Sequence, residues 1–219
     1  MRSGQGHTIS DGRFGVAVFL SGGVDSTVLL GKMCAEESSE LIAVHFAGFS
    51  SPEEAAAARA IAHQARVAYW SIDMSSLLLS WRSARVTQEG SGERAVFGAA
   101  TMYSAALAFA MAHKINSVAF GLHREDAQEY IEQSPSFLNY IRQGIKLVGS
   151  EVRILVPFQD MSKCDIVRIG NALSVDMSRS WSCLRPSVSM QCGTCEACLS
   201  RRNAFRQAAV VDATQYERQ

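Results

Sequence analysis

Short apolar runs alternate with helix-forming segments along most of the chain. Runs rich in Val, Ile, Leu and Ala predict five short buried strands, at residues 16–20, 41–46, 67–72, 118–121 and 153–156. The intervening segments predict helices over residues 26–35, 52–66, 95–113 and 162–173. This alternation is typical of an α/β fold, in which helices cover both faces of a parallel sheet of about five strands.

Two helix starts carry recognisable capping signals. Ser51-Pro52-Glu53-Glu54 combines a serine cap, a proline at the first helical position and a glutamate that can return to the cap. The run from Ser162 to Asp165 is a weaker version of the same signal. By contrast, residues 83–94 are rich in Gly and Ser around position 91 and predict a mobile loop.

The composition indicates a protein without a large charged surface. The 219 residues contain 21 Lys and Arg and 21 Asp and Glu, and this balance argues against binding to nucleic acid or to a membrane surface. No apolar run approaches the length of a membrane span, and residues 1–13 contain no signal-peptide core. We therefore expect a cytoplasmic protein whose six cysteines are reduced thiols, metal ligands or catalysts.

The segment 16–26 combines a strand, a glycine turn and a helix start. Gly22 and Gly23 let the main chain approach a ligand closely, and free N–H groups at a helix start attract anions. Ser21 and Ser26 add hydroxyl donors, so the loop is predicted to hold phosphate. It lacks the Gly-Lys-Ser/Thr of a Walker loop and the Gly-x-Gly-x-x-Gly of a dinucleotide fold. The alternative is an ordinary strand–turn–helix built from small residues.

Four of the six cysteines fall within a short stretch near the C-terminus, at Cys183, Cys192, Cys195 and Cys198. Thiolates at these spacings can surround one tetrahedral zinc ion, and a four-sulfur site is closed to water and hence structural. A redox role for one Cys-x-x-Cys pair is the alternative. Cys34 and Cys164 lie on predicted helices and are expected to be ordinary thiols.

Three further charged residues are candidates for the same site. Lys163 lies in a first helical turn, which disfavours cations, and this suggests an anion nearby; the alternative is a solvated lysine. Glu125 and Asp126 follow a short apolar strand, at the edge of the sheet where ligands bind, although an exposed acidic turn has the same pattern.

The loop and the tail together resemble a known family. Ser21-Gly22-Gly23-Val24-Asp25-Ser26 resembles the pyrophosphatase loop (PP-loop) of ATP-dependent adenylating enzymes, which include GMP, NAD and asparagine synthetases and tRNA thiolases. With Trp181-Ser182-Cys183 and the cysteine tail, it resembles the QueC-like 7-cyano-7-deazaguanine synthases. Residues 121–137 and 162–170 also follow that family's pattern, so the resemblance extends from about residue 15 to 206.

The resemblance implies a HUP-type PP-loop domain over residues 1–175 and a zinc-binding subdomain, residues 176–219, packed on it. It implies adenylation of the carboxylate of 7-carboxy-7-deazaguanine, attack by ammonia to give an amide, and elimination to a nitrile. ATP would be held, with Mg²⁺ bridging its phosphates, by Ser21, Gly22, Gly23, Asp25, Ser26 and Lys163. The catalytic residues would be Asp25, Ser26, Lys163 and Asp126.

Substrate contacts are expected from His123, Glu125 and Trp181. His123 stands where the family usually has asparagine. The indole of Trp181 would face the plane of the deazaguanine; alternatively, it caps the core above the zinc tail.

The chain departs from the family pattern in three places. Residues 47–51 lack the family's Gln-Arg-His, the Pro-x-Arg-Asn element is not recognisable near residues 96–99, and residues 131–134 replace Pro-Asp-Cys-Arg. These departures suit an enzyme with the same activation chemistry and a different acceptor. QueC-like proteins of antiviral operons, which resemble the synthase and attach a deazaguanine to a protein amine through an amide, are one such group. The acceptor would then be a protein encoded nearby.

Two other classes of function stay open at this point. One is another adenylating enzyme, such as a tRNA thiolase, which the neutral charge weighs against. The other is a non-catalytic zinc protein that only binds ATP or a purine. The apolar helix expected over residues 95–112 leaves room for a homodimer interface.

Overall fold

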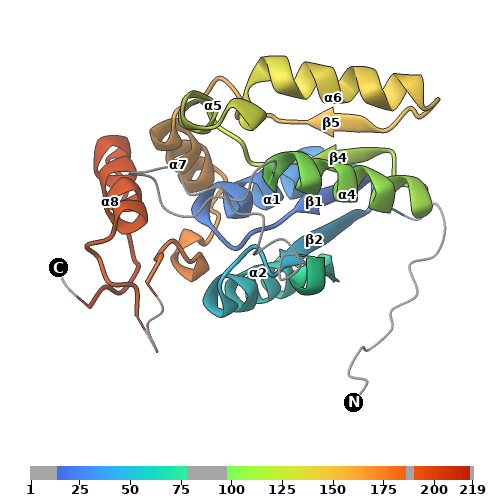
Figure 1. Cartoon of the computed structure of the whole chain (residues 1–219). Coiled ribbons are helices and arrows are strands. Elements are labelled where there is room, and N and C mark those ends of the chain that lie inside the picture. The colour runs from blue at the N-terminus through green and yellow to red at the C-terminus, as the bar shows by residue number, and fades with distance from the viewer. Residues whose placement is uncertain (1–13, 78–97, 186–189, 218–219) are drawn as a thin grey trace.

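The computed structural model describes residues 14–77, 98–185 and 190–217, and these form an α/β fold (Figure 1). All pairings in its five-stranded sheet are parallel, and the strand order is β3-β2-β1-β4-β5. The strands are β1 (Val16–Phe19), β2 (Leu41–Ala47), β3 (Ala68–Asp73), β4 (Ser117–Ala119) and β5 (Arg153–Leu155). The predicted fold class and all five predicted strands are confirmed, with ends that differ by one or two residues.

Helices cover both faces of the sheet because the central strands are apolar on both sides. One core joins alternate residues of β1, such as Val16 and Val18, to four helices: α1 (Val24–Glu36), α2 (Pro52–Gln64), α7 (Lys163–Ala172) and α8 (Glu196–Ala208). The other core joins Ala17 and Phe19 to α4 (Gly98–Ala112) and α6 (Pro135–Leu147). Within the described residues, no helix is both long and apolar enough to cross a membrane.

The two predicted capping signals are present. Ser51 and Glu54 form a reciprocal capping box at the start of α2, and Ser162 and Asp165 form another at the start of α7. Helix α6 was not expected from the sequence, although Ser134 caps it and Pro135 is its first residue, as in α2. Helix α8 was not expected either, because that segment was interpreted only as a metal-binding tail.

The C-terminal residues pack against the main core. Helix α8 lies beside α7 (Figure 1). Its residues Ala204, Phe205 and Ala208 join the core that contains Val16 and Val18 of β1. The boundary between residues 175 and 176 stays a prediction. The loop expected over residues 83–94 lies outside the described residues.

The fold brings three loops to one edge of the sheet. Strand β1 pairs with β2 on one side and with β4 on the other. Strands β2 and β3 therefore extend the sheet on one side of β1, and strands β4 and β5 extend it on the other. Ligands bind at such a switch point, beyond the carboxyl ends of the strands. The loops that follow β1, β2 and β4 meet there and carry most of the predicted site residues.

Candidate functional site

The loop between β1 and α1 has a backbone that requires glycine. Gly22 has a φ of +100°, and a Cβ atom added to it would lie 2.2 Å from the backbone oxygen of Glu54. Gly23 is the N-cap of α1 and has no side chain that could accept from the N–H groups of the first turn. These N–H groups therefore have no side-chain acceptor, and the positive end of the helix dipole is available to an anion.

Two serine hydroxyls are fixed within this loop. Ser21 Oγ lies 3.0 Å from Ser26 Oγ and accepts from the backbone N–H of Gly23 at 3.2 Å. Ser26 Oγ donates to the carbonyl oxygen of Gly23 at 3.1 Å. The hydroxyls that the sequence singled out are thus placed beside the uncapped helix start.

Lys163 is paired with Asp25. Its ammonium lies 3.1 Å from Asp25 Oδ2, and its side chain is only 24% exposed. The negative charge of Asp25 raises the pKa of Lys163 against the opposing effect of burial. Asp25 Oδ1 is buried and has no hydrogen-bond partner among the described residues. The geometry favours the functional interpretation of Lys163 over a solvated lysine, and it leaves one carboxylate oxygen available to a cation.

The loop after β4 brings His123 and Asp126 to the same place. Gly121 lets this loop approach α1, because a Cβ there would lie 3.1 Å from backbone atoms of Asp25. His123 caps the short helix α5 (Arg124–Glu129), and its Nε2 lies 3.4 Å from Asp126 Oδ1 and 3.9 Å from Asp25 Oδ2. Its Nδ1 lies 3.0 Å from the half-exposed carboxylate of Glu125.

The charge on Asp126 is disfavoured in this position. Burial raises its pKa, and the neighbouring carboxylate of Asp25 adds to the effect, while His123 and Lys163 oppose it. We call Asp25, His123, Asp126 and Lys163 the charged cluster. These four residues come from three separate segments and form one group beside the loop between β1 and α1.

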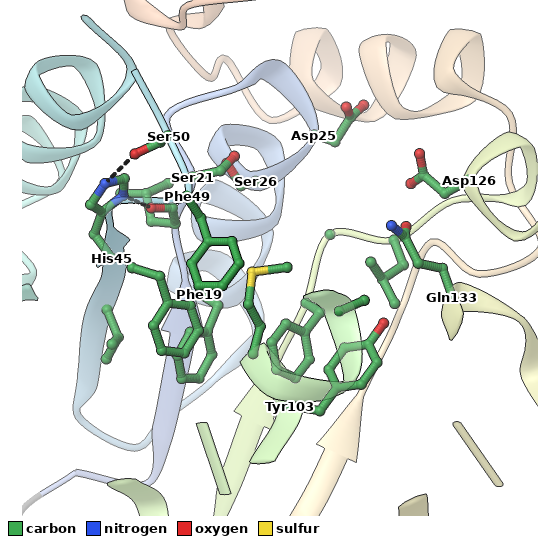
Figure 2. Close-up of a pocket in the computed structure, with 18 of the residues that line it drawn as sticks. Phe19, Ser21, Asp25, Ser26, His45, Phe49, Ser50, Tyr103, Asp126 and Gln133 are labelled. Carbon is green, nitrogen blue, oxygen red and sulfur yellow. Dashed lines mark hydrogen bonds between the residues drawn. The ribbon is translucent and has the colours of Figure 1, made fainter. Parts of the chain in front are cut away.

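A cavity of about 360 Å³ opens beside this loop. Its walls are mostly apolar and include Phe19, Phe46, Phe49 and Phe120. Figure 2 shows Tyr103, Gln133, Asp126 and Asp25 along one side, and His45 and Ser50 on the other. Neither His45 nor Tyr103 was expected from the sequence, since each lies within an apolar segment, and Gln133 was noted only as part of the 131–134 departure from the family pattern.

His45 is a buried neutral histidine with both nitrogens engaged. Its Nδ1 lies 2.8 Å from the carbonyl oxygen of Leu20, which can only accept, so Nδ1 carries the proton. Burial lowers its pKa, and its Nε2 then accepts from Ser50 Oγ at 2.8 Å. Near His45, the rings of Phe46 and Phe49 line the cavity, and Glu54, which is paired with Ser51 at the start of α2, also belongs to the lining.

Trp181 packs in the tail and is not among the residues that line this cavity. Its indole N–H donates to the carbonyl of Cys183 at 3.0 Å, and its ring contacts the cysteine cluster. Its backbone N–H donates to the carbonyl of Gly22 at 2.8 Å. The position matches the alternative in which Trp181 caps the core above the tail.

The four tail cysteines converge on one point. Their Sγ atoms all lie within 4.8 Å of one another, and the Cys192–Cys198 and Cys183–Cys195 pairs are each 4.0 Å apart. Sulfurs bound tetrahedrally at about 2.3 Å from a zinc ion would be about 3.8 Å apart, so the donor set fits such an ion. Convergence of four thiols favours a metal centre over a single redox pair.

The local backbone supports this centre. Gly193 turns the chain with a φ of +74°, and Cys195 is the N-cap of α8. A hydrogen bond from the backbone of Thr194 is the main cause that lowers the pKa of Cys192, to about 6, whereas burial raises the pKa values of Cys183 and Cys198. A thiolate is the form that binds metal. Cys34 and Cys164 lie outside the cluster, as expected, although Cys34 is exposed.

The parallel sheet and the loop after β1 define the PP-loop class of ATP pyrophosphatase folds. The family model described as "Queuosine biosynthesis protein QueC" matches residues 15–209, and the chain belongs to this family. A 7-cyano-7-deazaguanine synthase from Allorhizobium ampelinum is 32% identical, with 92% of each chain covered. One from Methanoculleus marisnigri is 31% identical, covering 91% of this chain and 97% of that one.

Among solved structures, the U34-tRNA thiolase NcsA from Methanococcus maripaludis has the same fold. Its TM-score is 0.51 at 16% identity, and the match covers 92% of this chain and 66% of that one. At this identity the likeness concerns the fold alone.

Proposed function

We propose that the chain is an ATP-dependent C–N ligase that adenylates the carboxylate of 7-carboxy-7-deazaguanine for attack by ammonia. The amide would form first and the nitrile, 7-cyano-7-deazaguanine, second. The observation that carries the proposal is the uncapped start of α1, which lies beside Asp25 and Lys163 at the mouth of a cavity large enough for planar ligands. The names of the relatives support it.

The proposed chemistry requires donors around a departing polyanion. A carboxylate is a poor electrophile because oxide would have to leave, whereas its adenylate releases AMP. Attack of the carboxylate oxygen on the α-phosphorus expels pyrophosphate, whose charge the loop N–H groups, the hydroxyls of Ser21 and Ser26 and the Lys163 ammonium would stabilise. The adenine would lie near His45, against the apolar rings of Phe46 and Phe49.

Two carboxylates are suited to a Mg²⁺ ion. Asp25 has a buried oxygen without a partner in the described chain, and Asp126 lies in the same cluster with a raised pKa that a nearby cation would offset. A bound Mg²⁺ would neutralise phosphate charge. The protein's own part is to hold the two carboxylates beside the loop, while Lys163 balances Asp25.

We further propose that the cysteine centre holds one structural zinc ion. Four buried sulfur donors leave no open position for water, which is the pattern of a structural site. A thiolate centre persists in a reducing compartment, in keeping with a cytoplasmic enzyme.

A second candidate differs only in the acceptor. Residues 131–134, which depart from the family pattern, have structural duties here: Glu132 accepts from the backbone N–H of Ala99, and Ser134 caps α6. Gln133 from the same segment lines the cavity. An altered wall suits an enzyme that joins the activated acid to the amine of a partner protein, a reaction that ends at the amide because a secondary amide cannot eliminate to a nitrile.

The test compares two carboxylates on one helix. Asp25→Asn keeps the size of the side chain and removes its charge, and we expect the release of AMP and pyrophosphate to fall at least about a hundredfold. Glu36→Gln is the matched control, because Glu36 also pairs with a lysine, Lys32, at the far and exposed end of α1. Equal activity of the two variants would contradict the proposal.

A further inference from the structure

The hydroxyl of Tyr103 is buried without a hydrogen-bond partner among the described residues. The side chain lines the cavity from α4 and is only 2% exposed. Burial raises the pKa of Tyr103, and the charges of Glu132 and Asp126 add to the effect, so the phenol stays protonated and can donate. A buried polar group without a partner lowers stability, so its presence needs an explanation, and a bound ligand that supplies the partner is one.

The Tyr103 ring is held in place by its aromatic neighbours. Phe120 meets it edge to face at 5.1 Å between ring centroids, and Phe120 itself stacks on Phe19 at 4.9 Å. The hydroxyl is therefore aimed by packing. A preorganised donor loses little entropy when it binds a ligand.

Gln133 is fixed beside the same helix. It belongs to the short 3₁₀ helix η2 (Ile131–Gln133), and Glu132 Oε2 accepts from the backbone N–H of Ala99 at 3.1 Å, which ties η2 to the start of α4. Figure 2 shows the Gln133 amide on the same side of the cavity as Tyr103. One wall thus carries a phenol donor and an amide that can donate and accept.

The position of this wall indicates which of the two ligands, ATP or the acid, it contacts. On the far side, His45 uses both nitrogens in hydrogen bonds within the protein and lies near the apolar rings of Phe46 and Phe49. The Tyr103–Gln133 wall lies on the side of Asp25 and Asp126. Under the proposed function, this is the side on which the carboxylate meets the α-phosphate. A planar acid that binds against this wall would have its carboxylate next to the loop.

We propose that Tyr103 and Gln133 form the recognition site for the heterocyclic body of the carboxylic acid, and so determine its specificity. Tyr103 donates to a ring carbonyl or ring nitrogen, and the Gln133 amide pairs with an adjacent donor–acceptor edge, as a guanine-like ring offers. The identity of the acid rests on the proposed function.

The test uses calorimetric binding of 7-carboxy-7-deazaguanine together with the KM for ATP. Tyr103→Phe removes only the hydroxyl, and we expect about tenfold weaker binding of the acid, the effect of one hydrogen bond, with the KM for ATP unchanged. Gln133→Leu should act in the same direction. The melting temperature of Tyr103→Phe should not fall, which separates recognition from a structural role. Tyr140→Phe, an exposed tyrosine on α6, is the control.

Unchanged binding of the acid by Tyr103→Phe, or a rise in the KM for ATP alone, would overturn the proposal. Failure of the proposed function has a different signature, since the wild-type protein would then not bind this acid. A panel of purine-like carboxylic acids would be the next probe. If no acid bound, or if the acid that bound lost nothing on Tyr103→Phe, the recognition site would be refuted as well.

Discussion

The backbone N–H of Trp181 donates to the carbonyl of Gly22 at 2.8 Å, and this bond joins the cysteine tail to the loop between β1 and α1. The residues on either side of Trp181 are held by the tail. Arg201 is fully buried and donates to both the carbonyl and the hydroxyl of Ser180. The backbone N–H of Ser182 donates to Gln191 Oε1 at 2.9 Å. We therefore expect the order of the loop to depend on a correctly folded tail.

Loss of one cysteine ligand should affect ATP binding at a distance. In Cys195→Ser we expect loss of the bound metal, a lower melting temperature and a KM for ATP raised about tenfold, because metal-binding energy is also folding energy. Metal analysis, thermal unfolding and hydrogen exchange at residues 21–24 measure the three effects. Cys34→Ser, an exposed thiol outside the cluster, should change none of them. A metal-free protein with unchanged ATP binding would refute this coupling.

Removal of Arg201 should be strongly destabilising. Its guanidinium pairs with Asp212 and also donates to the carbonyl of Met177. Arg201→Ala therefore removes the cation beside a partly buried carboxylate, which keeps only the neutral hydrogen bonds from Tyr216 and Thr214. We expect a loss of about 3–5 kcal/mol in the free energy of unfolding, measured by denaturant titration. Arg168→Ala breaks the exposed pair with Asp165 and should cost less than about 1 kcal/mol. Similar losses of unfolding free energy in Arg201→Ala and Arg168→Ala would show that the burial of Arg201 does not add to the strength of its ion pair.

Gly22→Ala tests the loop backbone itself. The positive φ and the approach to Glu54 should cost roughly 1–3 kcal/mol and weaken ATP binding, because the loop must shift. Gly144→Ala is the control, since a Cβ there meets nothing within 4 Å on helix α6 and should stabilise by about 0.5–1 kcal/mol. Full ATP affinity in Gly22→Ala would contradict the role given to this loop.

Asp126 should show a pH-dependent cost to stability. Its pKa is raised on folding, so the native state holds this proton more tightly than the unfolded state. The cost is absent below the ordinary pKa of about 3.9, grows as pH rises towards the raised value, and is complete above it. Asp126→Asn should therefore be more stable than wild type at pH 7, less so at low pH, and much less active.

Asp165 offers the opposite case. Hydrogen bonds from Ser162 lower the pKa of Asp165, so its ionised form stabilises the fold at neutral pH and loses that effect as pH falls through the lowered pKa. Asp165→Asn should be less stable than wild type at pH 7. Denaturant titrations at a series of pH values test both variants, and a shared sign of the two effects would contradict the account.

The sequence predicted the loop, the sheet and the cysteine centre because each is a local pattern. The glycine turn and the cysteine spacing are readable within a few residues, whereas the cavity wall is assembled from separate segments. Tyr103 lies within an apolar helix, and only tertiary packing shows that its hydroxyl has no partner among the described residues. His45 likewise lies in an apolar strand, and only the folded structure shows that both of its ring nitrogens are hydrogen-bonded. The role of Trp181, two residues before Cys183, was ambiguous until its ring was placed against the cysteines.

The most direct test of the central claim follows the carboxylate oxygen. The protein is incubated with ATP, ammonia and 7-carboxy-7-deazaguanine labelled with oxygen-18 in its carboxylate, and the products are analysed by mass spectrometry. Adenylation predicts that the label leaves in AMP, with pyrophosphate unlabelled: one AMP for each amide formed, and a second when the amide becomes the nitrile. Label in inorganic phosphate with release of ADP would contradict the account.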